Sequence, residues 1–338
     1  MNTVPLKFGK DKTAIIKGIA ILMMILLHCC CGPGWYDKEI PALQNASFVA
    51  FINGSLKICV AIYAFLVGFG YSFCKDRDIR YSLKHIWKLL VPYWIILLGL
   101  SLPFCNKEIG WDGIILSMFG IEGSLSWVNW FVYFYIFQML TLPILTRIID
   151  KKPFLLTLFF MMGFLGIKGV MHFYHIESNI WTDAVSACCI YSPIVLEGYL
   201  FGKEKLFTRI TLPANWPMVI AASCTIVFVP IFRSFGLSFV TEWVMVPVFI
   251  IAVLYLFTAY ELPVSSKILS ACGNNSVYMW FVHGLFFTGT IRWFWQRFIL
   301  ISDNLVIISL WTIVLTFGGS WVLKALVDSF SSKIPIKW

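Results

Sequence analysis

The chain has 338 residues, of which 59% are hydrophobic and only 13% are charged, and its mean hydropathy is +0.83. Roughly a quarter of the residues in a soluble globular domain are charged, so this composition excludes that class and indicates a membrane protein. The formal net charge is +9. The basic residues are dispersed over many loops, which excludes the single basic stripe of a nucleic-acid-binding protein.

Apolar stretches recur along the whole chain, and most approach the roughly 20 residues that a helix needs to cross a bilayer. We therefore predict an all-α fold, a polytopic membrane protein of about ten transmembrane helices in a single integral-membrane domain covering residues 1–338. The segment Asp112–Ser126 is too short to span and indicates an interfacial or re-entrant helix. The predicted spans are Thr13–Cys30, Leu56–Phe73, Ile86–Leu102, Val128–Ile148, Phe154–Val170, Ala184–Phe201, Met218–Phe232, Trp243–Tyr260, Ser276–Ile291 and Leu305–Leu326.

The distribution of basic residues predicts the orientation. With these spans, 19 of the 26 Lys and Arg residues fall on the side of the N-terminus. Cytoplasmic loops carry the excess of Lys and Arg in membrane proteins. We therefore expect a multi-pass protein of the cell membrane (the plasma or inner membrane), with both termini in the cytoplasm.

The first predicted span contains two ionisable residues, Lys17 and His28, eleven positions apart. Eleven residues of helix turn through about 1100° and rise about 16 Å, so the two side chains share one face. Ionisable groups within a membrane usually face a cavity or a partner. Two plainer interpretations remain, because Lys17 can extend to the headgroups as an interfacial lysine and His28 can be a hydrogen-bonded packing residue.

Five segments, in this order along the chain, resemble acyltransferase family 3, the integral-membrane acyltransferases that modify surface glycans. The first resembles the family's Arg, ten residues, then His signature, with Lys17 in place of the arginine. The second ends in Val-Gly-Phe-Gly where Ser-Gly-Phe is usual. The segments are KGIAILMMILLH (Lys17–His28), CVAIYAFLVGFG (Cys59–Gly70), HIWKLLVPYW (His85–Trp94), NWFVYFYIFQMLTLPIL (Asn129–Leu145) and GNNSVYMWFVH (Gly273–His283).

The resemblance implies transfer of an acyl group, with acetyl expected, from acyl-CoA to a hydroxyl of a cell-envelope or capsular saccharide. In that reaction His28 is the expected general base, because a neutral imidazole can accept a hydroxyl proton and return it to the leaving thiolate. Lys17 is its expected electrostatic partner or an anchor for CoA, since lysine supplies a point charge for phosphate. Glu197 lies in an apolar run, and either orients an imidazole or makes a helix-packing hydrogen bond.

Further residues complete the expected site. Arg77, Arg80, Lys84 and Lys88 form the largest basic group in the short loops. This group either receives the CoA phosphates or only determines topology. Ser276 and His283 share a helical face and are expected near CoA. Trp127 and Trp130 either stack on a sugar ring or belong to an interfacial aromatic belt. Arg292, with Arg233 and Arg297, is an unusual outer cation suited to an acidic glycan or a lipid-linked diphosphate.

The expected partners are acyl-CoA as co-substrate, a cell-surface glycan or lipid-linked saccharide, and membrane lipid, with no nucleic acid. The ten cysteines show no zinc or redox spacing, so we expect no metal. A homo-oligomer is left open. Acyl-CoA is expected to pass Lys17, Lys84 and Lys88 along one continuous polar channel to His28. The rival hypothesis is a transporter or flippase for a lipid-linked saccharide or anion, with His28 and Glu197 as proton-coupled groups.

Overall fold

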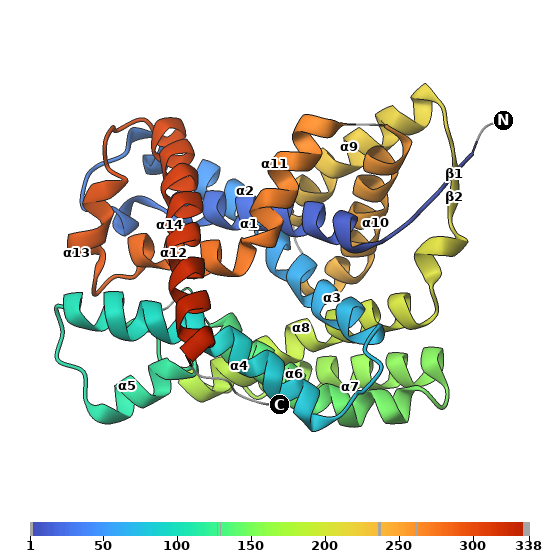
Figure 1. Ribbon diagram of the computed structural model, residues 1–338, viewed down its shortest axis with the longest axis horizontal. Helices are drawn as coiled ribbons and strands as arrows, with labels where there is room; N and C mark the ends of the chain where they lie inside the picture. Colours follow the sequence, from blue (N-terminus) through green and yellow to red (C-terminus); the bar gives the residue numbers. More distant parts are fainter. Residues whose placement is uncertain (1–2, 127, 129, 236–237, 261, 334–338) are drawn as a thin grey trace.

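The computed structural model describes residues 3–126, 128, 130–235, 238–260 and 262–333. It is built almost entirely of helices (Figure 1). The helices are α1 (Lys10–Cys29), α2 (Ala46–Leu56), α3 (Ile58–Ser72), α4 (Ile79–Ile96), α5 (Trp111–Met118), α6 (Phe131–Ile149), α7 (Pro153–Phe173), α8 (Ile180–Lys203), α9 (Trp216–Arg233), α10 (Ser238–Ala259), α11 (Pro263–Asn274), α12 (Ser276–Phe287), α13 (Arg292–Trp295) and α14 (Leu305–Lys333). The strands are β1 (Thr3–Pro5) and β2 (Thr211–Pro213).

The prediction of an all-α, multi-pass membrane fold is confirmed. Within the described residues, nine helical segments are long and apolar enough to cross a membrane. The remaining predicted span, Ser276–Ile291, corresponds to α12, which has only 12 residues and follows α11 after a break at Asn275. The second span begins earlier than predicted, because α2 precedes α3 with a break at Lys57. The first part of the segment Asp112–Ser126 lies in the eight-residue helix α5, which ends at Met118.

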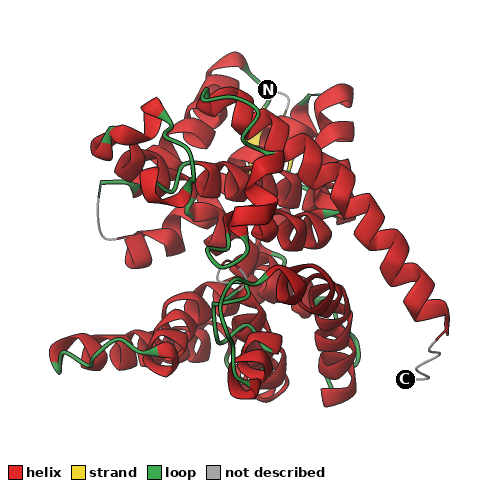
Figure 2. Ribbon diagram, turned by 90° about the vertical axis from the view of Figure 1, so that its left-hand side faces the viewer, coloured by secondary structure: helices red, strands yellow, loops and turns green. Residues whose placement is uncertain are grey.

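The helices form two layers that are joined by α3 (Figure 1). Helices α4 to α8 make up the lower layer, and α1, α2 and α9 to α13 make up the upper one. Helix α3 packs against α8 in one layer and against α1 and α10 in the other. In the view turned by 90°, the C-terminal helix α14 extends away from the helical body (Figure 2). Helices from distant parts of the sequence therefore meet between the two layers and can enclose a site there.

Two pairs of helices approach each other closely at glycines. A Cβ on Gly68 of α3 would lie 1.7 Å from the carbonyl oxygen of Val195 in α8, and one on Gly273 of α11 would lie 1.8 Å from that of Ala14 in α1. Apolar side chains gain little by meeting each other in lipid, so small residues that allow close backbone packing hold membrane helices together. These two contacts set the positions of α1, α3 and the start of α12.

Opposite ends of the long axis carry different elements. β1 and β2 lie at one end, and α5 and α13 lie at the other (Figure 1). β1 pairs with β2 in antiparallel register, from Thr3 opposite Pro213 to Pro5 opposite Thr211, and this pairing holds the N-terminal segment against the α8–α9 connection. The side of the membrane on which each end lies stays a prediction.

An ionic cluster holds the connections at the first of these ends. Asp150, between α6 and α7, accepts hydrogen bonds from Arg77 at 2.8 Å and Tyr199 at 2.6 Å, and it pairs with Lys203 at 3.0 Å. Burial alone would raise the pKa of the Asp150 carboxyl, but the hydrogen bonds from Tyr199 and Lys203 and the charge of Arg77 outweigh it, so the pKa is lowered from its usual value. Arg77, one of the predicted phosphate-binding group, is therefore engaged in joining three connections.

Candidate functional site

A cavity of about 390 Å³ lies between the two layers. Its wall is contributed by five helices, α1, α3, α4, α6 and α12. The lining contains three basic side chains and no acidic one among the residues that the structure describes. The lining residues are Lys17, Met24, Tyr63, Leu66, Val67, Gly70, Tyr71, Tyr81, His85, Lys88, Leu89, Phe131, Tyr135, Met139, Ser276, Val277 and Trp280. A cavity with cations and no carboxylates favours an anionic ligand.

One side of the cavity is formed by a polar stripe on α4. Tyr81, His85 and Lys88 follow the i, i+4, i+7 spacing that places side chains on one helical face. The ring of His85 is tied to its own helix, with Nδ1 2.9 Å from the carbonyl oxygen of Tyr81. Lys88 is exposed while still lining the cavity. This stripe forms the basic mouth of the cavity.

Lys17 faces this interior cavity rather than lipid. Its side chain lines the cavity and is half-buried. The hydroxyl of Tyr63 donates to the carbonyl oxygen of Lys17 at 3.1 Å, and Ser276 lines the cavity with them. Ser276 is the first residue of α12, where unpaired backbone N–H groups and the helix dipole add positive potential. Lys17 and Ser276 therefore belong to one electropositive level of the cavity.

His28 and His283 are hydrogen-bonded to each other. Nε2 of His283 lies 2.9 Å from Nδ1 of His28, and the two rings are 4.9 Å apart between centroids. His283 is fully buried, whereas His28 is half-buried. Contact between His283 and CoA stays a prediction, while the packing of α12 beside α1 brings the two imidazoles together. The pair was beyond sequence reasoning, since 255 positions separate its members.

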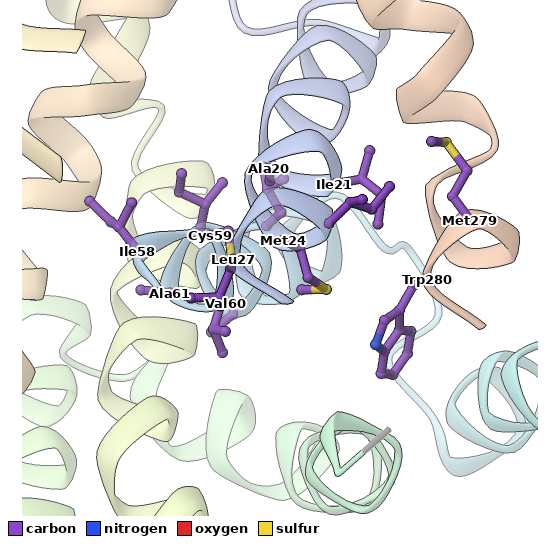
Figure 3. Close-up of a cluster of buried hydrophobic side chains, with 14 of the residues drawn as sticks. Ala20, Ile21, Met24, Leu27, Ile58, Cys59, Val60, Ala61, Met279 and Trp280 are labelled. Atoms are coloured by element: carbon purple, nitrogen blue, oxygen red, sulfur yellow. The ribbon is translucent and has the colours of Figure 1, made fainter. Parts of the chain in front are cut away.

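The cavity ends one helical turn before this pair. Its last residues on α1 and α12 are Met24 and Trp280, four residues before His28 and three before His283. Figure 3 shows Met24 and Trp280 projecting from their helices toward the same space. The expected continuous channel is therefore incomplete, because, among the described residues, the lining does not include either histidine.

Three of the predicted residues lie away from the cavity. Arg80 and Lys84 are exposed on α4, each one position before a lining residue, and thus about 100° around the helix from the cavity wall. Glu197 is half-buried in α8, outside the lining, and its Oε2 atom is buried with no hydrogen-bond partner. Glu197 lies outside this cavity wall, so its role as a catalytic residue stays a prediction.

The outer residues are engaged in packing and ion pairs. Trp130 is half-buried, with its ring 5.6 Å from that of Tyr191 on α8, so its surroundings are those of a packing residue. Arg292 pairs with Asp37 at 3.1 Å and donates to the carbonyl oxygen of Gly34. Trp127 lies outside the described residues.

A second outer cation is also neutralised within the fold. Arg233 is 7% exposed and forms an ion pair with the buried Glu242 at 2.6 Å. It also donates to the carbonyl oxygen of Gly54 at 2.5 Å. An acidic ligand would have to displace both partners, so Arg233 has a structural role in this fold and its contact with a glycan stays a prediction.

Sequence reasoning missed part of the cavity wall. Tyr63, Tyr81, His85 and Tyr135 line the cavity but were not selected as site residues. The available signal was the spacing of Tyr81, His85 and Lys88, which is a polar helical face within an amphipathic segment. No comparable signal marks Tyr63 or Tyr135, because aromatic residues within apolar helices are usually packing residues.

Comparison with known proteins assigns the family. A family model described as an acyltransferase domain matches residues 14–325, nearly the whole chain. The chain therefore belongs to acyltransferase family 3, and acyl transfer is its general activity. A search of curated proteins and a search of solved structures each found no match.

Proposed function

We propose that this family member transfers an acyl group, with acetyl the expected one, from acyl-CoA to a hydroxyl of a cell-envelope saccharide. The single observation that carries the proposal is a cavity whose described lining residues include basic side chains and no acidic one, and which ends beside the hydrogen-bonded pair His28 and His283. The family membership supports acyl transfer. The donor, the acceptor and the base are inferred from the chemistry of the residues.

The donor side follows from charge and dimensions. CoA carries phosphates at one end and a narrow pantetheine arm that ends in the thioester. Lys88 at the mouth and Lys17 further in offer point charges for the phosphates. Lys17 and Met24 are seven residues apart on α1, about 10 Å along the axis, so an extended arm would bring its thioester toward the level of Met24. The cytoplasm supplies CoA, which agrees with the predicted cytoplasmic side of the basic mouth.

The transfer step requires a base beside the thioester. We assign His28 as that base: it removes the proton from the acceptor hydroxyl, the oxygen attacks the thioester carbonyl, the carbon–sulfur bond breaks, and the thiolate takes up the proton. His283 would orient the base. In the tautomer that serves this role, Nδ1–H of His28 donates to Nε2 of His283, and the basic lone pair is then on Nε2 of His28.

The acceptor is expected from the other end of the site. His28 lies in the last turn of α1, remote from the basic segment at its start, and is half-buried, whereas His283 is fully buried. A saccharide hydroxyl approaching from the outer side would therefore meet His28 before its partner. This direction keeps the two substrates on opposite sides of the membrane until they meet at the imidazole.

The test replaces His28 and measures both donor consumption and product. His28→Ala should lower acyl-CoA-dependent transfer about 100-fold or more, the usual contribution of a general base, with normal protein in the membrane. The matched control is His172→Ala, which removes an exposed histidine at the end of α7 and should leave transfer unchanged. Mass spectrometry of the envelope glycans reports the ester directly.

Two outcomes would contradict the proposal. Normal glycan acylation by a well-expressed His28→Ala protein would refute the assignment of the base. If deletion of the gene changed the amount of glycan but left its acyl esters in place, transport of a lipid-linked saccharide would replace acyl transfer to glycan as the function.

A further inference from the structure

Helices α1 and α12 run side by side, in the same direction, past three successive levels of the site. At the first level the hydroxyl of Tyr63 donates to the carbonyl oxygen of Lys17, and Ser276 lines the cavity together with these two residues. At the third level the two histidines meet. Between them stand Met24 and Trp280, the residues at which the cavity ends. Along α1 and α12, Met24 and Trp280 therefore lie between the cavity and the histidines.

The two members of the pair differ in mobility. The ring of Trp280 is 7% exposed, stacks on Phe281 at 4.7 Å and meets the edge of Phe131 at 5.7 Å. Aromatic contacts on two sides hold it in one position. Met24 is 6% exposed, and its unbranched thioether chain with three rotatable bonds adapts readily to its surroundings. A change of rotamer at Met24 therefore requires less free energy than a movement of the Trp280 ring, and is the expected way to open the passage.

We propose that Met24 and Trp280 form a gate that selects short acyl groups. This inference rests on the proposed function, because it presumes that a thioester is delivered through the cavity. When the side chain of Met24 moves aside, a small acyl group can reach His28. A longer acyl chain is blocked by the indole of Trp280, which does not move. The selection is thus made by these two side chains and not by the basic mouth of the cavity near Lys88.

The experiment compares acyl-CoA donors of increasing chain length on the full-length protein. The readout is the ratio of kcat/KM for hexanoyl-CoA to that for acetyl-CoA. Trp280→Leu and Met24→Ala, made separately, should each raise this ratio about 10-fold or more, since a few methylenes rejected by a tight wall account for differences of that order. Two variants on different helices keep the test valid if one of them fails to fold.

The matched control is Met139→Ala, the same truncation in the same cavity. Met139 lines the cavity from α6 and is 3% exposed. It lies on neither α1 nor α12, the two helices that carry the gate residues and the histidines. Its replacement should change KM for all donors alike and leave the ratio unchanged. An increased ratio in both gate variants with an unchanged ratio in the control supports the gate.

The possible failures are distinguishable. A wild-type protein that transfers acetyl normally, together with an unchanged chain-length ratio in the folded gate variants, would overturn the gate and leave the proposed function standing. A wild-type protein that consumes no acyl-CoA of any length in the presence of envelope glycan would overturn the proposed function and, with it, the gate.

Discussion

Replacing Gly68 with alanine tests whether close contact between α3 and α8 stabilises the fold. The added Cβ would lie 1.7 Å from the carbonyl oxygen of Val195, whereas ordinary contact begins at 3.4 Å. The two helices would thus have to separate by about 1.7 Å at this point. The obstacle is backbone, which has no rotamer to change, so we expect a cost at the upper end of the roughly 1–3 kcal/mol that is typical of overpacking.

The matched control is Gly70→Ala, two residues along the same helix. A Cβ at Gly70 has nothing within 4 Å, so alanine there should stabilise the helix by about 0.5–1 kcal/mol. We therefore expect the two variants to differ by roughly 2–4 kcal/mol.

The assay is thermal unfolding in detergent, followed by tryptophan fluorescence and by the fraction that remains monodisperse. The expected result is a clearly lower midpoint for Gly68→Ala than for Gly70→Ala. Equal midpoints for the two variants would refute the reasoning, since they would mean that the α3–α8 contact yields to a methyl group without loss.

Three further predictions concern single side chains. Lys17→Arg, which restores the family's usual residue, should keep activity, whereas Lys17→Met should raise KM for acyl-CoA. Unchanged kcat and KM for acyl-CoA in the methionine variant would mean that Lys17 is only an interfacial lysine. His283→Phe should lower kcat and alter its pH profile, and His283→Gln should recover part of the rate by restoring a hydrogen bond to His28; equal rates in both would exclude a positioning role. Asp150→Asn should cost about 1–3 kcal/mol of stability at pH 7. The folded-state pKa of Asp150 is lowered, so the extra stability of the wild-type protein over the variant is present above the unfolded-state pKa of about 3.9 and is lost as the pH falls through the folded-state pKa. A difference in unfolding midpoint that does not change with pH would contradict this prediction.

Properties that depend on one segment at a time were predictable from the sequence. The membrane class follows from composition, and nine of the predicted spans correspond to long apolar helices among the described residues. Lys17 and His28 could be placed on one face because helical periodicity relates residues of a single helix without knowledge of its neighbours. The five ordered segments indicated the family, which the match over residues 14–325 confirms.

Which helices meet, and at which residues, was decided only by the tertiary structure. The sequence placed His28 and His283 in separate motifs with separate roles, and only the packing of α11 and α12 along α1 brings Nδ1 of His28 within 2.9 Å of Nε2 of His283. The same holds for Arg233, which looks like an unpaired outer cation until Glu242 is placed beside it. Periodicity determines the face of a helix on which a residue lies, but the partner of that face depends on how close two backbones can come. That distance depends on the shapes of both helices, and glycine allows the closest approach. It therefore cannot be predicted from either segment alone.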